Sequence, residues 1–422
     1  MSEKRRDNKG RILLSNERQR PDGKYEYRYI DRNGVKHSIY SWKLVSTDKI
    51  PNGKKCEESL RDMKRKIEKD LEDGIDPAKS QNTTLNQYYE EYINSKYELK
   101  TSTRVNYKYL YEKYIKDNLG NKKMYDIKYI DIKNFYIYLV DKLGLKIGTI
   151  KIIDNILHQM FNVAVRNGDI RYNPTTGVIY EIKKANNFEN IKRRALTIPQ
   201  QELLIDFCKN NTMYNHWLPL ITVFLGTGCR VGEIIGLRWE DCDFEKSIIS
   251  INHILTYRPQ DNRKYEFHIT TPKTKNSIRI IPMLKDVKKV LLEERLRQMK
   301  IGFNTSVIDG YSGFIFQSRV RTVIFPQKIN EVLESIRIKC NQQEEENAIR
   351  EMREPVIIPH FSVHNLRHTF CTRFCENETN IKVIQEIMGH ADITTTMDVY
   401  NEATIEKKVE SFFNLEGKIK IN

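Results

Sequence analysis

The spacing of apolar residues changes along the chain, and each change predicts a different kind of structure. Near the start, Tyr25, Tyr27 and Tyr29 alternate with charged residues, the period of two that is typical of a half-buried strand. A Pro-Asp-Gly turn signal precedes this strand and an Asn-Gly signal follows it. We therefore expect the segment from about 10 to 45 to form a three-stranded sheet.

A charged amphipathic helix is predicted to follow the sheet, over residues 55–73. Leu60, Met63, Ile67 and Leu71 share one face of it. This helix would cover one face of the sheet. The other face could enter the major groove of DNA, or the module could be only a basic cap on the next domain.

From about residue 84 to 171 the apolar spacing is helical throughout. Tyrosines and lysines interleave here, which favours either ammonium groups presented to phosphates or an ordinary tyrosine-rich core. A polar segment from about 172 to 194 is predicted to be a linker. The helices are expected over 84–95, 102–117, 130–143 and 147–167.

The rest of the chain predicts a mixed domain. Helices are expected over 198–210, 215–226 and 231–238, then short strands near 247–254, 265–271 and 277–281, then helices to about 414. The predicted fold class is therefore multidomain α+β: a small sheet with one helix, an all-α bundle, and a mixed α/β domain. We place these parts at 1–80, 83–172 and 195–422, with the linker at 173–194.

The charge composition of the chain favours one class of binding partner. The 422 residues carry a formal net charge of +15, which favours a polyanion because bound phosphates release their counterions. The seven cysteines lack paired spacing, so we expect free thiols, a cytoplasmic protein and no disulfides. No long apolar run predicts a membrane helix. Cys371, Cys375, His364 and His368 share a helical stripe, but small core residues explain the cysteines better, and no metal is predicted.

The residue types needed to cleave a DNA phosphodiester occur in order in the second half of the chain. Arg230 follows Gly226-Thr227-Gly228 where a helix is expected to begin, so its planar fork and nearby backbone amides can meet a phosphate. Glu233 follows one helical turn later, where its carboxylate can orient Arg230 or a nearby basic side chain. Its alternative role is to match the helix dipole.

Two further motifs complete the set. His364 and Arg367 are one helical turn apart, and His390 follows Gly389, a residue that lets the backbone approach a ligand. Tyr400 supplies a phenol ten residues later. Taken singly, each is more often structural. Together they provide cationic donors, a proton handler and a nucleophile, with neither a metal nor ATP.

These motifs resemble those of the tyrosine recombinases, the lambda-integrase family. The resemblance rests on Thr-Gly-Cys-Arg-Val-Gly-Glu from Thr227, His-Asn-Leu-Arg-His-Thr-Phe from His364, Met388-Gly-His and Asp398-Val-Tyr. The opening residues, with Tyr-Ser-Trp-Lys-Leu-Val from Tyr40, look like the integrases of conjugative transposons. The resemblance covers essentially the whole chain, and implies a SAM-like bundle for the helical part.

The resemblance also implies roles. Arg230 and Arg367 would clamp the scissile phosphate, and His364 and His390 would complete the cage. Tyr400 would attack, leaving a 3′-phosphotyrosyl link and a free 5′-hydroxyl. The general acid for the leaving oxygen would be Lys273, with Lys275 as the alternate.

The implied partners are double-stranded DNA at core and arm sites and further copies of the chain in a tetramer. An excisionase, a DNA-bending host protein and an association with the bacterial nucleoid are also implied, and no cofactor. A C-terminal exchange helix is expected to dock on a neighbouring protomer or to pack on its own domain; its apolar residues are Val409, Phe412, Phe413 and Leu415. A type IB topoisomerase and a non-catalytic DNA-binding regulator remain the alternatives.

Overall fold

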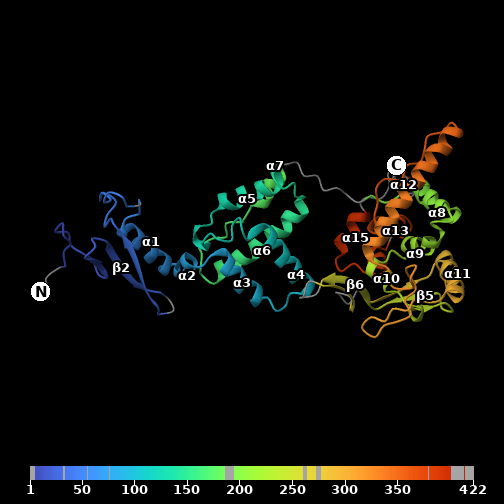
Figure 1. Ribbon diagram of the computed structural model, residues 1–422, viewed down its shortest axis with the longest axis horizontal. Helices are drawn as coiled ribbons and strands as arrows, with labels where there is room; N and C mark the ends of the chain where they lie inside the picture. Colours follow the sequence, from blue (N-terminus) through green and yellow to red (C-terminus); the bar gives the residue numbers. More distant parts are fainter. Residues whose placement is uncertain are drawn as a thin grey trace, which may run out of the picture. The chain divides into compact units, whose positions relative to one another are not determined.

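In the computed structural model the chain forms two compact units, residues 1–190 and 191–422 (Figure 1). The division falls within the predicted linker. The structure describes residues 5–31, 34–54, 56–75, 77–185, 194–259, 264–271, 277–378, 380–400 and 413.

The first unit begins with the predicted three-stranded sheet. Strands β1 (Glu17–Gln19), β2 (Tyr25–Ile30) and β3 (Lys36–Ser41) are antiparallel in that order. The three tyrosines of β2 are buried against helix α1 (Leu60–Glu72). This helix begins later than the predicted 55, because the Ser59 hydroxyl accepts from the Asp62 amide and caps it.

A helical bundle forms the rest of this unit around a continuous apolar core. The fold class predicted from the sequence is confirmed. The segment expected to be one helix over 102–117 instead ends in a π-helical turn. The elements are α2 (Pro77–Asn82), α3 (Leu85–Ser95), α4 (Thr101–Leu110), η1 (Tyr111–Ile115), η2 (Met124–Asp126), α5 (Tyr129–Asp141), α6 (Ile147–Arg166) and α7 (Val178–Ala185).

Helix α7 corrects the predicted linker. Its residues lie inside the segment 173–194, which the polar composition marks as a connector. Val178 and Ile182, one turn apart, are nonetheless buried in the bundle core. Residues 186–193 of the predicted linker lie outside the described residues.

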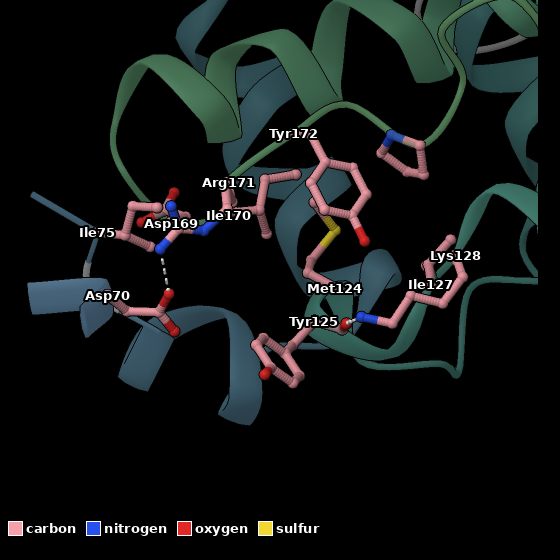
Figure 2. Close-up of a pocket in the computed structure, with 11 residues that line it drawn as sticks. Asp70, Ile75, Met124, Tyr125, Ile127, Lys128, Asp169, Ile170, Arg171 and Tyr172 are labelled. Carbon is pink, nitrogen blue, oxygen red and sulfur yellow. Dashed lines mark hydrogen bonds and ion pairs between the residues drawn. The ribbon is translucent and has the colours of Figure 1, made fainter. Parts of the chain in front are cut away.

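The end of α1 meets the bundle around a cavity of about 140 Å³ (Figure 2). Arg171 donates to Asp70 at 2.8 Å and pairs with Asp73 at 2.6 Å. The backbones approach closely here, since a Cβ on Gly168 would lie 2.7 Å from the carbonyl oxygen of Gly74. The sheet module and the bundle are therefore joined by ion pairs as well as by the chain.

The second unit holds two small antiparallel sheets among helices. One has the strand order β4-β5-β8 and the other is the hairpin β6-β7. Three strands were expected, so β4 and β6 were missed. The strands are β4 (Cys242–Asp243), β5 (Ile248–Ile251), β6 (Ile254–Pro259), β7 (Tyr265–Thr270) and β8 (Arg279–Pro282).

Helices enclose these sheets, and α9 packs on both α11 and α13. The helix expected over 231–238 ends at Ile235. Within the described residues no helix has the length and apolar character needed to span a membrane. The helical elements are α8 (Ile198–Asn210), η3 (Asn215–Trp217), α9 (Leu218–Thr227), α10 (Val231–Ile235), η4 (Trp239–Asp241), α11 (Lys285–Ile301), α12 (Pro326–Arg350), α13 (Val363–Asn377), α14 (Ile381–Met388) and α15 (Ile393–Tyr400).

Candidate active site

Arg230 lies at the start of α10, as its sequence position predicts. Gly228 ends α9 in the left-handed conformation, at φ +61°, and the chain turns there into the next helix. Arg230 is the N-cap residue. Its Nη1 donates to Glu233 at 2.9 Å and its Nη2 to the carbonyl of Gly389 at 2.8 Å. The side chain is one-third exposed, so the guanidinium remains open to a ligand.

Arg367 reaches the same place from α13. Its Nη1 donates to the Gly228 carbonyl at 2.5 Å and its Nη2 to the Met388 carbonyl at 2.7 Å. Burial, followed by repulsion from Arg230, lowers the pKa of Arg367 to about 10. It therefore stays charged at neutral pH. Burying this charge beside Arg230 is unfavourable, and an incoming anion would offset that free energy.

His390 closes the cluster from the turn between α14 and α15. Gly389 ends α14 at φ +63°, and His390 is buried. Its Nδ1 lies 2.9 Å from the hydroxyl of Thr396 on α15. Burial and then the charges of Arg367 and Arg230 lower its pKa to about 4. The imidazole is therefore neutral near pH 7, and its second nitrogen can share a hydrogen bond with a phosphate.

The Glu233 carboxylate contacts Arg230, as the sequence spacing predicts, and also a second arginine that sequence reasoning missed. Its carboxylate accepts from Arg230 and from Arg279 of β8, whose Nη2 and Nη1 lie at 2.9 and 3.2 Å. Arg279 also donates from Nε to the Ile387 carbonyl at 2.6 Å. Burial would raise the pKa of Glu233, but the hydrogen bond and charge of Arg279, with those of Arg230, lower it to about 2.

Sequence reasoning missed Arg279 because Ile278 and Ile280 flank it, an alternation that predicts an outward-facing arginine. Its neighbours Ile278 and Ile280 are more than half exposed, whereas Ile281, on the same side of β8 as Arg279, is buried. A charged residue at an inward position of an alternating strand indicates a buried ion pair. Thr396 was also missed, because nothing near it in the sequence marks its hydroxyl as the partner of His390.

The structure describes the other predicted site residues only in part. His364 is exposed on the first turn of α13, one turn before Arg367. Tyr400 is the last residue of α15, four residues after Thr396; its side chain is outside the described residues. Lys273 and Lys275 lie in 272–276, which are also outside them.

The cluster carries more positive than negative charge. Arg230, Arg279 and Arg367 contribute three guanidinium groups, and Glu233 contributes one carboxylate. With His390 neutral, two positive charges remain. Such a site can stabilise the charge that develops on a phosphodiester during displacement. In the described part of the chain no group of three His, Cys, Asp or Glu side chains is arranged to hold a metal ion.

The fold and this cluster define a tyrosine recombinase. The chain belongs to the phage integrase family, which matches residues 194–407. Residues 1–71 match the DNA-binding domain of the Tn916 integrase, and residues 84–140 match the SAM-like N-terminal domain of phage integrases. The three matches follow one another along the chain.

Relatives of similar length support the assignment. The chain is 34% identical to the transposase from transposon Tn1545 of Streptococcus pneumoniae over 409 residues, 96% of this chain and 95% of that protein. The same identity and coverage hold for the transposase from transposon Tn916 of Enterococcus faecalis. The integrase of transposon Tn1549 (residues 82–397), solved with transposon right end DNA, superposes with a TM-score of 0.68 at 28% identity and covers 79% of this chain and all of that one.

Proposed function

We propose that the chain is the integrase of a conjugative transposon, which inserts and excises the element by site-specific strand exchange. The observation that carries this proposal is the cluster of Arg230, Arg367 and His390. Backbone carbonyls at two glycine turns hold the arginines, and the Thr396 hydroxyl meets the histidine. A tyrosine ends the helix that carries Thr396. A relative supports DNA as the substrate, since the Tn1549 integrase is solved with both transposon right end DNA and circular intermediate DNA.

In the proposed reaction the phenol oxygen of Tyr400 attacks the scissile phosphorus. The bond from phosphorus to the 5′-oxygen breaks, and a 3′-phosphotyrosyl bond forms. Arg230, Arg367, His364 and His390 hold the non-bridging oxygens, and Glu233 orients Arg230. Lys273, or Lys275 in its place, gives a proton to the leaving 5′-oxygen.

Rejoining reverses this step with the 5′-hydroxyl of a partner strand. The phosphotyrosyl link retains the energy of the broken bond, so no nucleotide cofactor is needed. Two such exchanges pass through a Holliday junction in a tetramer of this chain. An excisionase and a DNA-bending host protein would set the direction, and the protein would act at the bacterial nucleoid.

Each predicted domain has its own role in this proposal. Residues 1–80 would bind distal arm sites, 83–172 and 195–422 would bind the core site, and the segment after Tyr400 would dock on a neighbouring protomer. The arm module separates this proposal from a type IB topoisomerase, which makes the same covalent bond but only relaxes DNA.

The test uses a nicked suicide duplex that carries the end of the element encoding the chain. After incubation, a denaturing gel should show a protease-sensitive covalent complex with the wild type and none with Tyr400→Phe, which should still bind the duplex. Tight binding without a covalent complex on either element end would favour a non-catalytic DNA-binding regulator. Relaxation of plasmids that lack the element end would favour a topoisomerase.

A further inference from the structure

A buried carboxylate lies in the sheet face turned away from α1. Since Tyr25, Tyr27 and Tyr29 pack on that helix, the alternating residue Glu26 points to the opposite face. Its exposed fraction is only 1%. Among the described residues, two arginines cover it: Arg18, directly opposite on β1, and Arg28, two positions along β2.

Both arginines bind this carboxylate through Nε. Arg18 donates Nε to one carboxylate oxygen of Glu26, and Arg28 donates Nε to the other at 2.9 Å. The Ser38 hydroxyl, opposite Arg28 on β3, is a third hydrogen-bond partner of the carboxylate. An arginine held through Nε keeps its two terminal nitrogens directed outward as a fork.

Stability alone gives a poor account of this arrangement. The side chains of Arg18 and Arg28 are 50% and 57% exposed, and ion pairs with solvated arginines contribute little to stability. An acidic residue in the middle of a face that meets DNA also repels phosphates. The pairing does fix the direction of two guanidinium forks before any ligand arrives, which reduces the entropy lost on binding.

We infer that Arg18 and Arg28, held by Glu26, read guanine bases in the major groove of the arm-site DNA. This inference rests on the proposed function and adds the base that the arm module recognises. The O6 and N7 atoms of guanine accept the two parallel hydrogen bonds of an arginine fork. Because both Nε atoms bind one carboxylate, the two forks address guanines about one or two base pairs apart.

The test selects binding sites from a random duplex library with the full chain. The wild type should select a motif with guanine at two nearby positions. Arg18→Lys and Arg28→Lys keep the charge but lose the fork, so each should lose the preference for guanine at one position, by roughly 5- to 150-fold. Glu26→Gln keeps the size of the side chain and should weaken both preferences.

Glu26→Gln also separates positioning from charge. The variant removes a negative charge, so its binding to unrelated DNA should become tighter while its selectivity falls. The two arginines stay solvated, and a melting curve should confirm that the variant folds. The matched control is Lys36→Ala at the end of the same face, which should weaken binding to all sequences and reduce the salt slope by about 1.

An unchanged motif with Arg18→Lys and Arg28→Lys would overturn the inference. So would tighter binding by Glu26→Gln with unchanged selectivity, which would make Glu26 a neutralising charge only. Either result leaves the proposed function intact, provided that the suicide duplex still yields a Tyr400-dependent covalent complex. If that complex is absent while guanine selection depends on both arginines, the proposed function fails and the base reading stands.

Discussion

Replacing Glu233 with glutamine tests whether the carboxylate holds the arginine cluster together. Glu233→Gln keeps the shape of the side chain and removes its charge. Arg279, whose side chain is only 5% exposed, would then face a neutral amide in place of a carboxylate. Arg230 and Arg367 would lose the compensating charge at the same time.

The magnitude follows from the pKa of Glu233. Its value falls from 4.5 to about 2 on folding, and each unit corresponds to about 1.36 kcal/mol. The charged form is therefore stabilised by about 3 kcal/mol relative to the protonated form. This agrees with the range of about 3–5 kcal/mol for breaking a buried ion pair. We expect Glu233→Gln to lower the free energy of unfolding by about 3 kcal/mol at pH 7.

The sign of the pH dependence follows from the lowered pKa. Above about pH 5 Glu233 is ionised in the folded and unfolded chain, and its contribution is complete. As the pH falls through 4.5 the unfolded chain takes up the proton first, so the contribution decreases and is lost near pH 2. The difference between wild type and Glu233→Gln should decrease over that window.

The assay is urea unfolding followed by tryptophan fluorescence. The chain has three tryptophans, so in a Trp42→Phe background the fluorescence comes from Trp217 and Trp239, both in the second unit. Glu240→Gln is the control, because Glu240 is 68% exposed and its partner Arg238 also pairs with Asp241. It should cost less than about 1 kcal/mol. A loss below 1 kcal/mol for Glu233→Gln at pH 7, or one independent of pH, would refute the reasoning.

Three further predictions use the same assay. Thr396→Val removes the hydroxyl that meets His390 and should lower the free energy of unfolding by about 1 kcal/mol. The control Thr394→Val, on the exposed side of α15, should lower it by less. Equal losses of stability would count against the contact between Thr396 and His390. Gly228→Ala places a Cβ 2.3 Å from the Phe370 ring. It should therefore lower the free energy of unfolding by about 1–3 kcal/mol more than Gly310→Ala, where φ is also positive but the space around the glycine is open. Because the pKa of His390 falls to about 4 on folding, the wild type should lose stability as the pH falls from about 6.5 to 4, and His390→Gln should lose less there.

The residues proposed to perform chemistry could be selected from the sequence because they form a rare set in a fixed order. Arg230, Arg367 and His390 come together as expected. Arg279 could not be found this way. Its partner Glu233 lies 46 residues away, and only the folded chain shows that β8 turns the arginine inward.

The errors in the predicted secondary structure have a similar origin. The predicted helix after Arg230 continues to 238, but the helix stops at Ile235, and the next residue, Gly236, packs directly on the backbone of β6. A Cβ at Gly236 would lie 2.9 Å from the amide nitrogen of Leu255. Helix α7 shows the opposite error, since its apolar residues Val178, Ile179 and Ile182 occupy a short segment with two lysines in its last turn, so the sequence does not predict their burial. In both places contacts distant in sequence decide the local structure.

The cluster owes its geometry to backbone carbonyls more than to other side chains. Each guanidinium has five N–H donors. Arg230 donates one to Gly389, and Arg367 donates to Gly228 and Met388. Both glycines adopt the left-handed conformation that ends a helix. Carbonyls do not titrate and cannot change rotamer, so they fix the direction of the guanidinium groups in the way that the proposed phosphate cage requires. Glu233 adds the charge compensation that carbonyls cannot provide, which is why its loss should cost more than the loss of any one of these hydrogen bonds.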